Sequence, residues 1–306
     1  MSATKDLPPH QPGELRVTHY GAAAWAMTDG KKTLLFDPYF TRLRYAGKRF
    51  GTLPAPSAVG DTRHAYDFDE VPVSDTSTID ANINEADFIF LSHSHFNHCM
   101  DVPYIAKKTG ATVLGTESTA NIARAHGVAE ERILTVRGGE DYAFDDFSLK
   151  VVPSLHSALS EKLYFESGIV PRDVKVPMRL CDYVEGRTLA YFIRWGEHRI
   201  LWFGSMNFIE REIQGLDPTM VFVASSRPRL QIHDYTGRLL RAVGCPPLVV
   251  ATHWDIQTFP YGASQDLALE QSQSFVDEVE AVAPGTDVVV PRHFETVRIG
   301  ADGKRL

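Results

Sequence analysis

The sequence is poor in cysteine and has no long apolar segment. Its 306 residues include 3 cysteines, Cys99, Cys181 and Cys245, which are too few and too scattered for a disulfide framework or a paired-cysteine zinc site. No apolar run reaches the roughly 18 residues that a membrane-spanning helix needs. The opening, MSATKDLPPHQPGEL, lacks the apolar stretch of a secretory signal. We therefore expect a soluble, cytoplasmic protein with no integral membrane segment.

Basic charge and nucleotide-binding motifs are also scarce. The 31 Lys and Arg are outnumbered by 39 Asp and Glu, for a net charge of −8, which argues against nucleic acid as a partner. No GxGxxG or GxxxxGK[ST] motif is present, and Gly204-Ser205 does not belong to a GxSxG serine-hydrolase motif. A small-molecule substrate is expected. The acidic surface is compatible with a homo-oligomer.

The residues that are present alternate between strand and helix patterns. Short apolar runs interspersed with helical patterns, without a linker or an internal repeat, predict a single α/β domain over 1–306. Two segments do not fit this pattern. Residues 1–14 are expected to form a loose arm. Residues 41–84, rich in Pro, Gly, Ser and Asp, are expected to form a long loop insertion, either a solvated surface segment or a substrate lid.

The most informative motif is SHSHFNH at 92–98, which directly follows the apolar strand pattern of 88–91. Side chains alternate along a strand, so His93 and His95 are predicted to share a face, and His98 follows where the chain turns. Three imidazoles this close together need a partner for every ring nitrogen. One metal ion satisfies several of them at once, and neutral imidazole is a common metal ligand. The motif therefore predicts a metal site.

Other histidines follow apolar strands elsewhere in the chain. His156 comes after LKVVPSL and His253 after PLVVAT. Strand ends in α/β sheets converge where ligands bind, so both are predicted to join the cluster. His293, after DVVVPR, has the same local pattern, and its role is left open.

The order of these motifs resembles that of a known family. SHSHFNH, His156, Gly204-Ser205 and His253 match the metallo-β-lactamase superfamily pattern, with Asn97 in place of the usual Asp of HxHxDH. VTHYGAAAWAMTDGKKTLLFDPYF and HWDIQTFP are similar to segments of the branch that contains ascorbate-6-phosphate lactonases and N-acylphosphatidylethanolamine phospholipase D. The resemblance covers nearly the whole chain. It implies an αββα sandwich of two mixed β-sheets flanked by helices, with a metal site at one edge.

The resemblance also implies roles for individual residues. The positions matching a first metal site are His93, His95 and His156; those matching a second are Asn97, His98 and His253, with Ser205 where the family has a bridging Asp. Two carboxylates are thus replaced by neutral groups, which leaves two cations in one pocket to repel each other. A single ion on the three-histidine set is therefore favoured over two. Zinc is expected first, and Mn, Fe and Ni are also compatible.

Several side chains have two open interpretations. Asn97 cannot accept a proton, so His98 and His253 are candidates for proton transfer as well as for binding a second ion. Asp37 orients a ligating histidine or caps a turn. Asp255 shares in proton transfer or is exposed on its loop. Three more assignments concern neighbouring segments: Cys99 is a soft-metal ligand or a small buried hydrophobe, Asp101 caps a helix from Val102, and Trp202 belongs to the core.

The predicted function is a metal-dependent hydrolase. A water activated by the ion would attack a lactone or an ester, with a phosphodiester as the second choice. Arg172, Lys175 and Arg179 are candidates for holding an anionic group, or are ordinary surface charge. Two other classes stay open: a metal-dependent redox protein of the same fold, and an inactive ligand-binding member.

Overall fold

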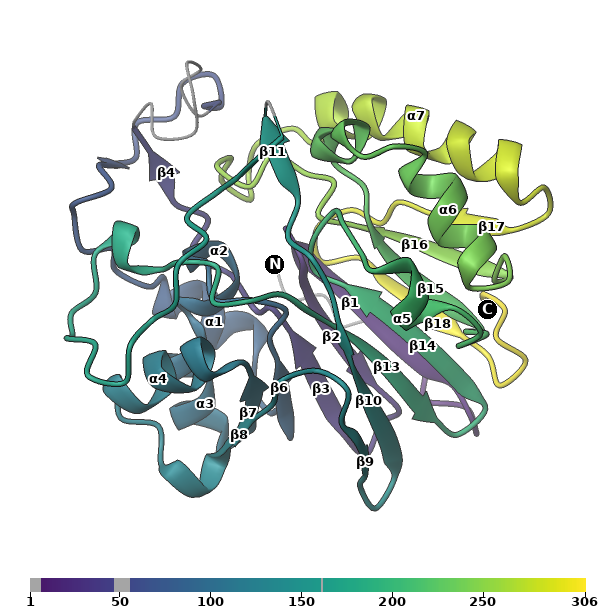
Figure 1. Ribbon diagram of the computed structural model, residues 1–306, viewed down its shortest axis with the longest axis horizontal. Helices are drawn as coiled ribbons and strands as arrows, with labels where there is room; N and C mark the ends of the chain where they lie inside the picture. Colours follow the sequence, from purple (N-terminus) through teal and green to yellow (C-terminus); the bar gives the residue numbers. More distant parts are fainter. Residues whose placement is uncertain (1–6, 47–55, 161) are drawn as a thin grey trace.

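The computed structural model describes residues 7–46, 56–160 and 162–306, and within them two seven-stranded mixed sheets face each other (Figure 1). The first sheet has the spatial order β18 (Thr296–Ile299), β1 (Leu15–Gly21), β2 (Ala24–Thr28), β3 (Thr33–Phe36), β6 (Phe88–Phe90), β7 (Thr112–Gly115) and β8 (Ile133–Thr135). The second has the order β17 (Asp287–Val289), β16 (Leu248–Thr252), β15 (Met220–Ala224), β14 (His198–Phe203), β13 (Leu189–Trp195), β10 (Phe147–Pro153) and β9 (Asp141–Ala143).

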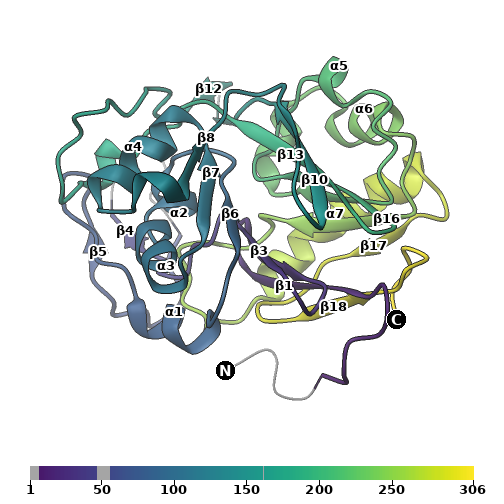
Figure 2. The same ribbon diagram turned by 90° about the horizontal axis from the view of Figure 1, so that it is seen from below.

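Helices cover the outer face of each sheet, as the view in Figure 2 shows. Those on the first sheet are α1 (Thr76–Asn82), α2 (Phe96–Cys99), α3 (Val102–Thr109) and α4 (Glu117–Ala125). Those on the second are α5 (Glu210–Ile213), α6 (Tyr235–Ala242) and α7 (Asp266–Val282). Short elements complete the description: β4 (Arg44–Tyr45), β5 (Ala65–Tyr66), β11 (Ala158–Ser160), β12 (Leu163–Tyr164), and the 3-10 turns η1 (Glu130–Arg132), η2 (Leu180–Asp182) and η3 (Arg227–Gln231). In the described parts of the chain, no helix combines the length and apolarity that crossing a membrane requires.

Three apolar layers separate these four layers of secondary structure. One cluster lies between the two sheets and includes Trp25, Phe36 and Trp202, all completely buried. The other two lie between each sheet and its helices. Both sheets therefore have two apolar faces, which is why their strands appear in the sequence as continuous apolar runs rather than alternating ones. The predicted αββα sandwich is confirmed, and Trp202 is a core residue as expected.

Local sequence signals place most element ends correctly. β2 and β3 form the expected hairpin, with Thr28 paired to Thr33 across the Asp29-Gly30 turn. Gly110 ends α3 in the left-handed conformation at φ +75°, which glycine adopts at little cost. Asp101 occupies the N-cap position before Val102, as predicted, but it does not cap α3 through its side chain. Its side chain makes no capping bond and instead accepts hydrogen bonds from Thr41 at 2.9 Å (backbone N) and 2.6 Å (Oγ1).

The segment expected to be a loop over 41–84 contains regular structure. Residues 76–82 form α1, capped by Asp75, whose carboxylate accepts from the Thr78 N–H at 3.0 Å. Ile79 is the one buried residue of this helix, so its sequence has no apolar periodicity by which it could be predicted. Residues 47–55 of this segment lie outside the described residues.

The expected N-terminal arm has no helix or strand over residues 7–14, and residues 1–6 lie outside the described residues. Its end is nevertheless anchored. The buried Glu14 carboxylate pairs with Arg16 at 2.7 Å and with Arg298 of β18 at 2.8 Å.

Candidate metal centre

The histidine motif lies in a turn between two elements. β6 ends at Phe90 and α2 begins at Phe96, so His93 and His95 are not part of a strand. They do come together, as predicted, but the turn brings them together and not the alternation of a pleated strand. His156 arrives from the second sheet, three residues beyond the end of β10.

Three imidazoles form a nearly equilateral triangle. The ring centroids of His93, His95 and His156 are separated by 4.8, 4.7 and 4.7 Å. One nitrogen from each ring lies within 4.8 Å of the other two, and all three residues are buried. No carboxylate belongs to this group. We refer to it as the three-histidine cluster.

Hydrogen bonds fix the tautomer of His93. The Ser92 hydroxyl donates to the Asp37 carboxylate at 2.5 Å and therefore must accept the bond from His93 Nδ1 at 2.8 Å. His93 thus carries its proton on Nδ1 and leaves a lone pair on Nε2. This Nε2 is buried and has no hydrogen-bond partner among the described residues.

The other two rings are fixed by backbone carbonyls. His95 Nε2 lies 3.2 Å from the Phe165 carbonyl oxygen, and His156 Nδ1 lies 2.9 Å from the Ser157 carbonyl oxygen. A carbonyl only accepts, so these nitrogens carry the protons, and His95 Nδ1 and His156 Nε2 keep free lone pairs. Each ring of the cluster therefore offers one unprotonated nitrogen.

Electrostatics favour the neutral form of these rings. Burial lowers the pKa of His156 to about 3, and burial together with the neighbouring imidazoles holds the pKa values of His93 and His95 well below their ordinary value. Neutral imidazole is the form that ligates metals. Three such ligands, one of them an otherwise unpartnered buried nitrogen, fit a divalent cation.

His98 and Asn97, next to the cluster, hydrogen-bond to other side chains. His98 donates from Nδ1 to Asp37 at 2.5 Å, so its Nε2 is the free nitrogen. Its ring centroid lies 3.9 Å from that of His93 and 5.4 Å from that of His253. Asn97 donates through Nδ2 to the Gln257 side-chain oxygen at 2.7 Å. The predicted pairing of Asp37 with a histidine of the motif is therefore present.

A second group of possible ligands, Asp37, His93 and His98, also lies within 4.8 Å. Its carboxylate is already engaged, because it accepts from the Ser92 backbone N–H at 2.7 Å as well as from the Ser92 hydroxyl and His98. This group is a hydrogen-bond network that orients two histidines.

Gly204 and Ser205 directly follow β14 and lie next to this network. A Cβ at Gly204 would collide with the Ser92 hydroxyl and the Asp37 carboxylate, so the close approach requires glycine. The Ser205 hydroxyl accepts from the Ser157 backbone N–H at 3.0 Å and lines the pocket. Its predicted contact with a metal remains a prediction.

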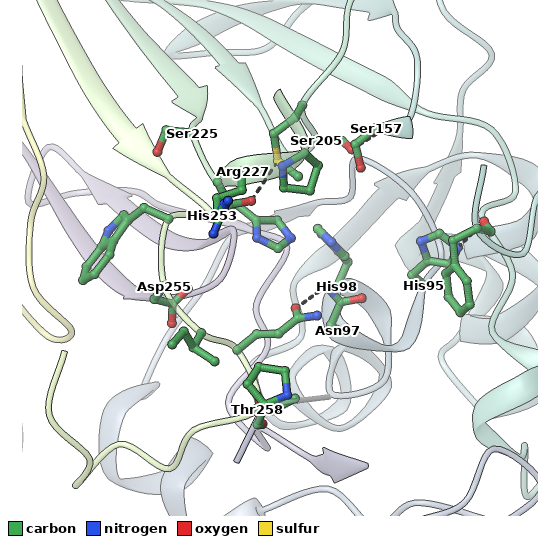
Figure 3. Close-up of a pocket in the computed structure, with 18 of the residues that line it drawn as sticks. His95, Asn97, His98, Ser157, Ser205, Ser225, Arg227, His253, Asp255 and Thr258 are labelled. Atoms are coloured by element: carbon green, nitrogen blue, oxygen red, sulfur yellow. Dashed lines mark hydrogen bonds between the residues drawn. The ribbon is translucent and has the colours of Figure 1, made fainter. Parts of the chain in front are cut away.

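The cluster opens into a pocket with a volume of about 370 Å³ (Figure 3). Residues that follow strands of both sheets line it, including His95, His98, His156 and His253. Apolar lining is supplied by Tyr45, Phe96, Phe165, Met206, Trp254 and Ile256. A volume of this size accommodates a small molecule.

Asp255 and His293 belong to a different group. Asp255 pairs with Arg42 at 2.7 Å, accepts from His293 Nε2 at 2.7 Å and accepts from the Ala22 backbone N–H at 2.8 Å. It is buried, so the prediction that it is exposed on its loop is wrong, and its carboxylate does not face a histidine of the three-histidine cluster. The rings of His19 and His293 are tilted against each other, with 5.8 Å between their centroids. We call these four residues the Arg42–Asp255 network.

The structure also decides the remaining alternatives. Cys99 is a buried core residue. Arg172, Lys175 and Arg179 are exposed and do not line the pocket. Gln257, the partner of Asn97, was not identified from the sequence, because no spacing rule links a glutamine at 257 to an asparagine 160 positions earlier.

Together, two mixed sheets packed face to face and a buried cluster of unprotonated imidazole nitrogens at their edge define a metal-binding protein of the αββα class. The beta-lactamase superfamily domain model matches residues 16–215. The chain belongs to this superfamily.

Relatives and solved structures agree with this assignment. A metal-dependent hydrolase of Staphylococcus aureus (strain JH9) is 35% identical over 122 residues, which are 39% of this chain and 51% of the relative. The chain thus spans about half the length of the curated relatives it matches. Igni18, a metallo hydrolase from Ignicoccus hospitalis, is 14% identical with a TM-score of 0.55, covering 94% of this chain and 98% of that one. An isothiocyanate hydrolase from Delia radicum gut bacteria is 17% identical with a TM-score of 0.55, covering 92% and 98%. At these identities the structural likeness shows the fold.

Proposed function

We propose that this protein is a metal-dependent hydrolase that holds one divalent cation on the three-histidine cluster and acts on a lactone or an ester. The convergence of three unprotonated ring nitrogens from His93, His95 and His156 carries the proposal. The name of the Staphylococcus aureus relative supports the same class of activity. We propose zinc as the ion and the cytoplasm as the location, the latter from the low cysteine content.

Different residues of the site would bind the metal, transfer the proton and bind the substrate. His93, His95 and His156 would hold a divalent cation, which would supply Lewis-acid activation of water and of the bond to be cleaved. Asp37 holds His98 by its Nδ1 proton, so His98 Nε2 is the nitrogen that takes a proton during attack and returns it to the leaving group. His253 lines the same pocket, with its ring centroid 5.4 Å from that of His98, and is placed to donate a hydrogen bond to the substrate.

The neutral Asn97 favours a single ion over two. Its amide donates to Gln257, and an amide brings no negative charge to offset a second cation. A carbonyl substrate is therefore preferred over a phosphodiester, because cleavage of a phosphodiester gains most from two ions that clamp both oxygens.

The test is metal content per chain, by elemental analysis of protein purified without added metal, in the parent and in an Asn97→Asp variant. We expect about one equivalent of zinc in the parent, rising toward two in the variant, because three imidazoles suffice for one ion and the new carboxylate completes a second site. Asn82→Asp is the matched control. Asn82 lies at the end of α1, so the same charge change there leaves the metal content unaltered.

Other results would redirect the assignment. Bound iron with a visible absorption band would favour the redox alternative. No metal in either protein after reconstitution, together with no turnover on a panel of esters and lactones, would contradict the hydrolase and favour an inactive ligand-binding member.

A further inference from the structure

The pocket that opens from the three-histidine cluster carries one unbalanced formal charge. Among the described residues that line it, only Arg227 and Asp255 are charged at neutral pH when the histidines are neutral. Burial alone would raise the pKa of Asp255, but Arg42 and His293 hold it well below its ordinary value. The negative charge of Asp255 is thus compensated within the Arg42–Asp255 network. The positive charge of Arg227 is left over.

Arg227 and Arg229, both in η3, differ in their hydrogen-bond partners. Arg229 is buried and donates to Glu278 at 2.8 Å, to Ser274 at 2.7 Å and to the Ser225 carbonyl at 2.8 Å. Arg227 is exposed and makes no hydrogen bond or ion pair with any residue in the described part of the chain. Arg229 therefore anchors the turn, and the guanidinium of Arg227 has no structural partner.

Arg227 lies across the pocket from part of the three-histidine cluster. Figure 3 shows Arg227 on the same side of the pocket as His253 and Ser225, with His95 on the opposite side. A ligand held by Arg227 would therefore extend toward the three-histidine cluster. The Ser157 hydroxyl also lines the pocket; it is buried and has no hydrogen-bond partner among the described residues. Its O–H is available to an oxygen acceptor.

We propose that the substrate of this pocket has an apolar body and one anionic oxygen group, and that Arg227 binds this group and determines the specificity for it. The planar guanidinium binds carboxylate or phosphate oxygens in pairs, and Phe165, Met206 and Ile256 supply apolar walls for the body. The proposal rests on the proposed hydrolase function, because it names the substrate class of that same site.

The test measures binding and not turnover. Phenylacetate and its neutral isostere phenylacetamide are titrated calorimetrically into protein stripped of metal by a chelator, so that a carboxylate–metal bond does not contribute. Phenyl phosphate forms a second arm that distinguishes a phosphate from a carboxylate group. We expect the preferred anion to bind about tenfold more tightly than the amide, the typical gain from a hydrogen bond to a charged group.

Three variants assign this preference to Arg227. Arg227→Gln should bind anion and amide equally, and Arg227→Lys should keep part of the preference. Arg211→Gln is the matched control: Arg211 is exposed on α5 and does not line the pocket, so it should keep the full preference. Circular dichroism checks that each stripped protein remains folded, and the titrations are repeated with metal bound if one does not.

The outcomes separate this proposal from the hydrolase assignment. Equal binding of anion and amide, no detectable binding of either anion, or a preference that survives Arg227→Gln would overturn the role of Arg227. If the protein takes up no metal on reconstitution and turns over no ester or lactone, a preference that depends on Arg227 would support the anion site and overturn the hydrolase.

Discussion

The Arg42–Asp255 network and the three-histidine cluster are both buried and both contain histidines, but the rings have different partners. In the Arg42–Asp255 network the carboxylate of Asp255 receives an arginine, a histidine and a backbone N–H. In the three-histidine cluster no ring is hydrogen-bonded to a carboxylate of the described residues, and one nitrogen of each ring lies within 4.8 Å of the other two. A buried polar group needs a partner. The network compensates its own charges and leaves one ring nitrogen, His293 Nδ1, without a hydrogen-bond partner among the described residues, which indicates a structural role. The cluster instead keeps three unprotonated ring nitrogens and no carboxylate, which indicates a ligand site.

The surrounding backbone shows the same difference. Arg42 donates from Nε to the Phe259 carbonyl at 2.6 Å and from Nη2 to the Ile256 carbonyl at 2.8 Å, so the network fixes the loop that follows His253. A Cβ at Gly21, whose φ is +95°, would collide with Arg42 and crowd Asp255. Of the network only Asp255 lines the pocket, whereas His95 and His156 of the cluster both do. The two groups should therefore respond differently to mutation.

The largest expected effect is on stability, from Asp255→Ala. Removing one partner of a buried ion pair leaves Arg42 buried and uncompensated, which costs about 3–5 kcal/mol of unfolding free energy. Denaturant unfolding of metal-free protein measures this loss. Asp80→Ala is the control: Asp80 pairs with Lys108 on the surface at 2.6 Å, and exposed pairs contribute about 1 kcal/mol or less. Equal losses in the two variants would contradict the structural role of the network.

The second effect is on metal binding, from His95→Ala. Loss of one of three ligands should weaken zinc binding by more than about 100-fold, which exceeds the loss from removing a hydrogen-bond partner of a ligand. Competition with a chromophoric chelator measures the affinity. The unfolding free energy of the metal-free variant should fall by only about 1 kcal/mol, because the hydrogen bond that His95 loses, from Nε2 to the Phe165 carbonyl at 3.2 Å, joins two neutral groups. His64→Ala is the control, since His64 is exposed and pairs with Glu70. A variant that keeps its zinc but unfolds more easily would reverse the comparison.

The sequence predicts more of the cluster than of the network. The alternation of apolar runs and glycine stops predicts an α/β domain, and the resemblance to the metallo-β-lactamase superfamily implies the αββα layers. Dense histidines after a strand predict the ligands because no self-contained arrangement satisfies so many rings. The network escapes prediction because Arg42, Asp255 and His293 lie far apart in the chain and none has a distinctive local pattern. The helix α1 is not predicted either, because Ile79 is its one buried residue and its sequence therefore has no apolar periodicity.

A further limit is set by the side chains themselves. The sequence presents His293 and His253 in the same way, each soon after an apolar strand. Only the fold shows that His293 reaches Asp255 at 2.7 Å, while His253 faces the pocket. Strand ends determine which edge a residue occupies, but the neighbour that it meets there depends on loop geometry.

The smallest expected effect concerns pH and tests the network through His19. Its two ring nitrogens face the carbonyls of Pro291 and Ala22 at 3.1 and 3.3 Å, and burial together with His293 lowers the pKa of His19 to about 4 from 6.5. The unfolded chain therefore binds more protons between these two pH values, so stability rises with pH across this window and is lost as the pH falls through it.

His19→Gln removes this titration and keeps an N–H donor at the position where the neutral imidazole donates to one of the two carbonyls. In metal-free protein the variant should lose less stability than the parent between pH 6.5 and 5.5, by about 1 kcal/mol, the linkage expected of one histidine kept neutral. Denaturant unfolding at the two pH values gives the difference. His126→Gln is the control, because His126 lies at the end of α4, away from both groups. An unchanged slope in His19→Gln would mean that the acid sensitivity comes from the three-histidine cluster alone, since its buried rings titrate in the same direction.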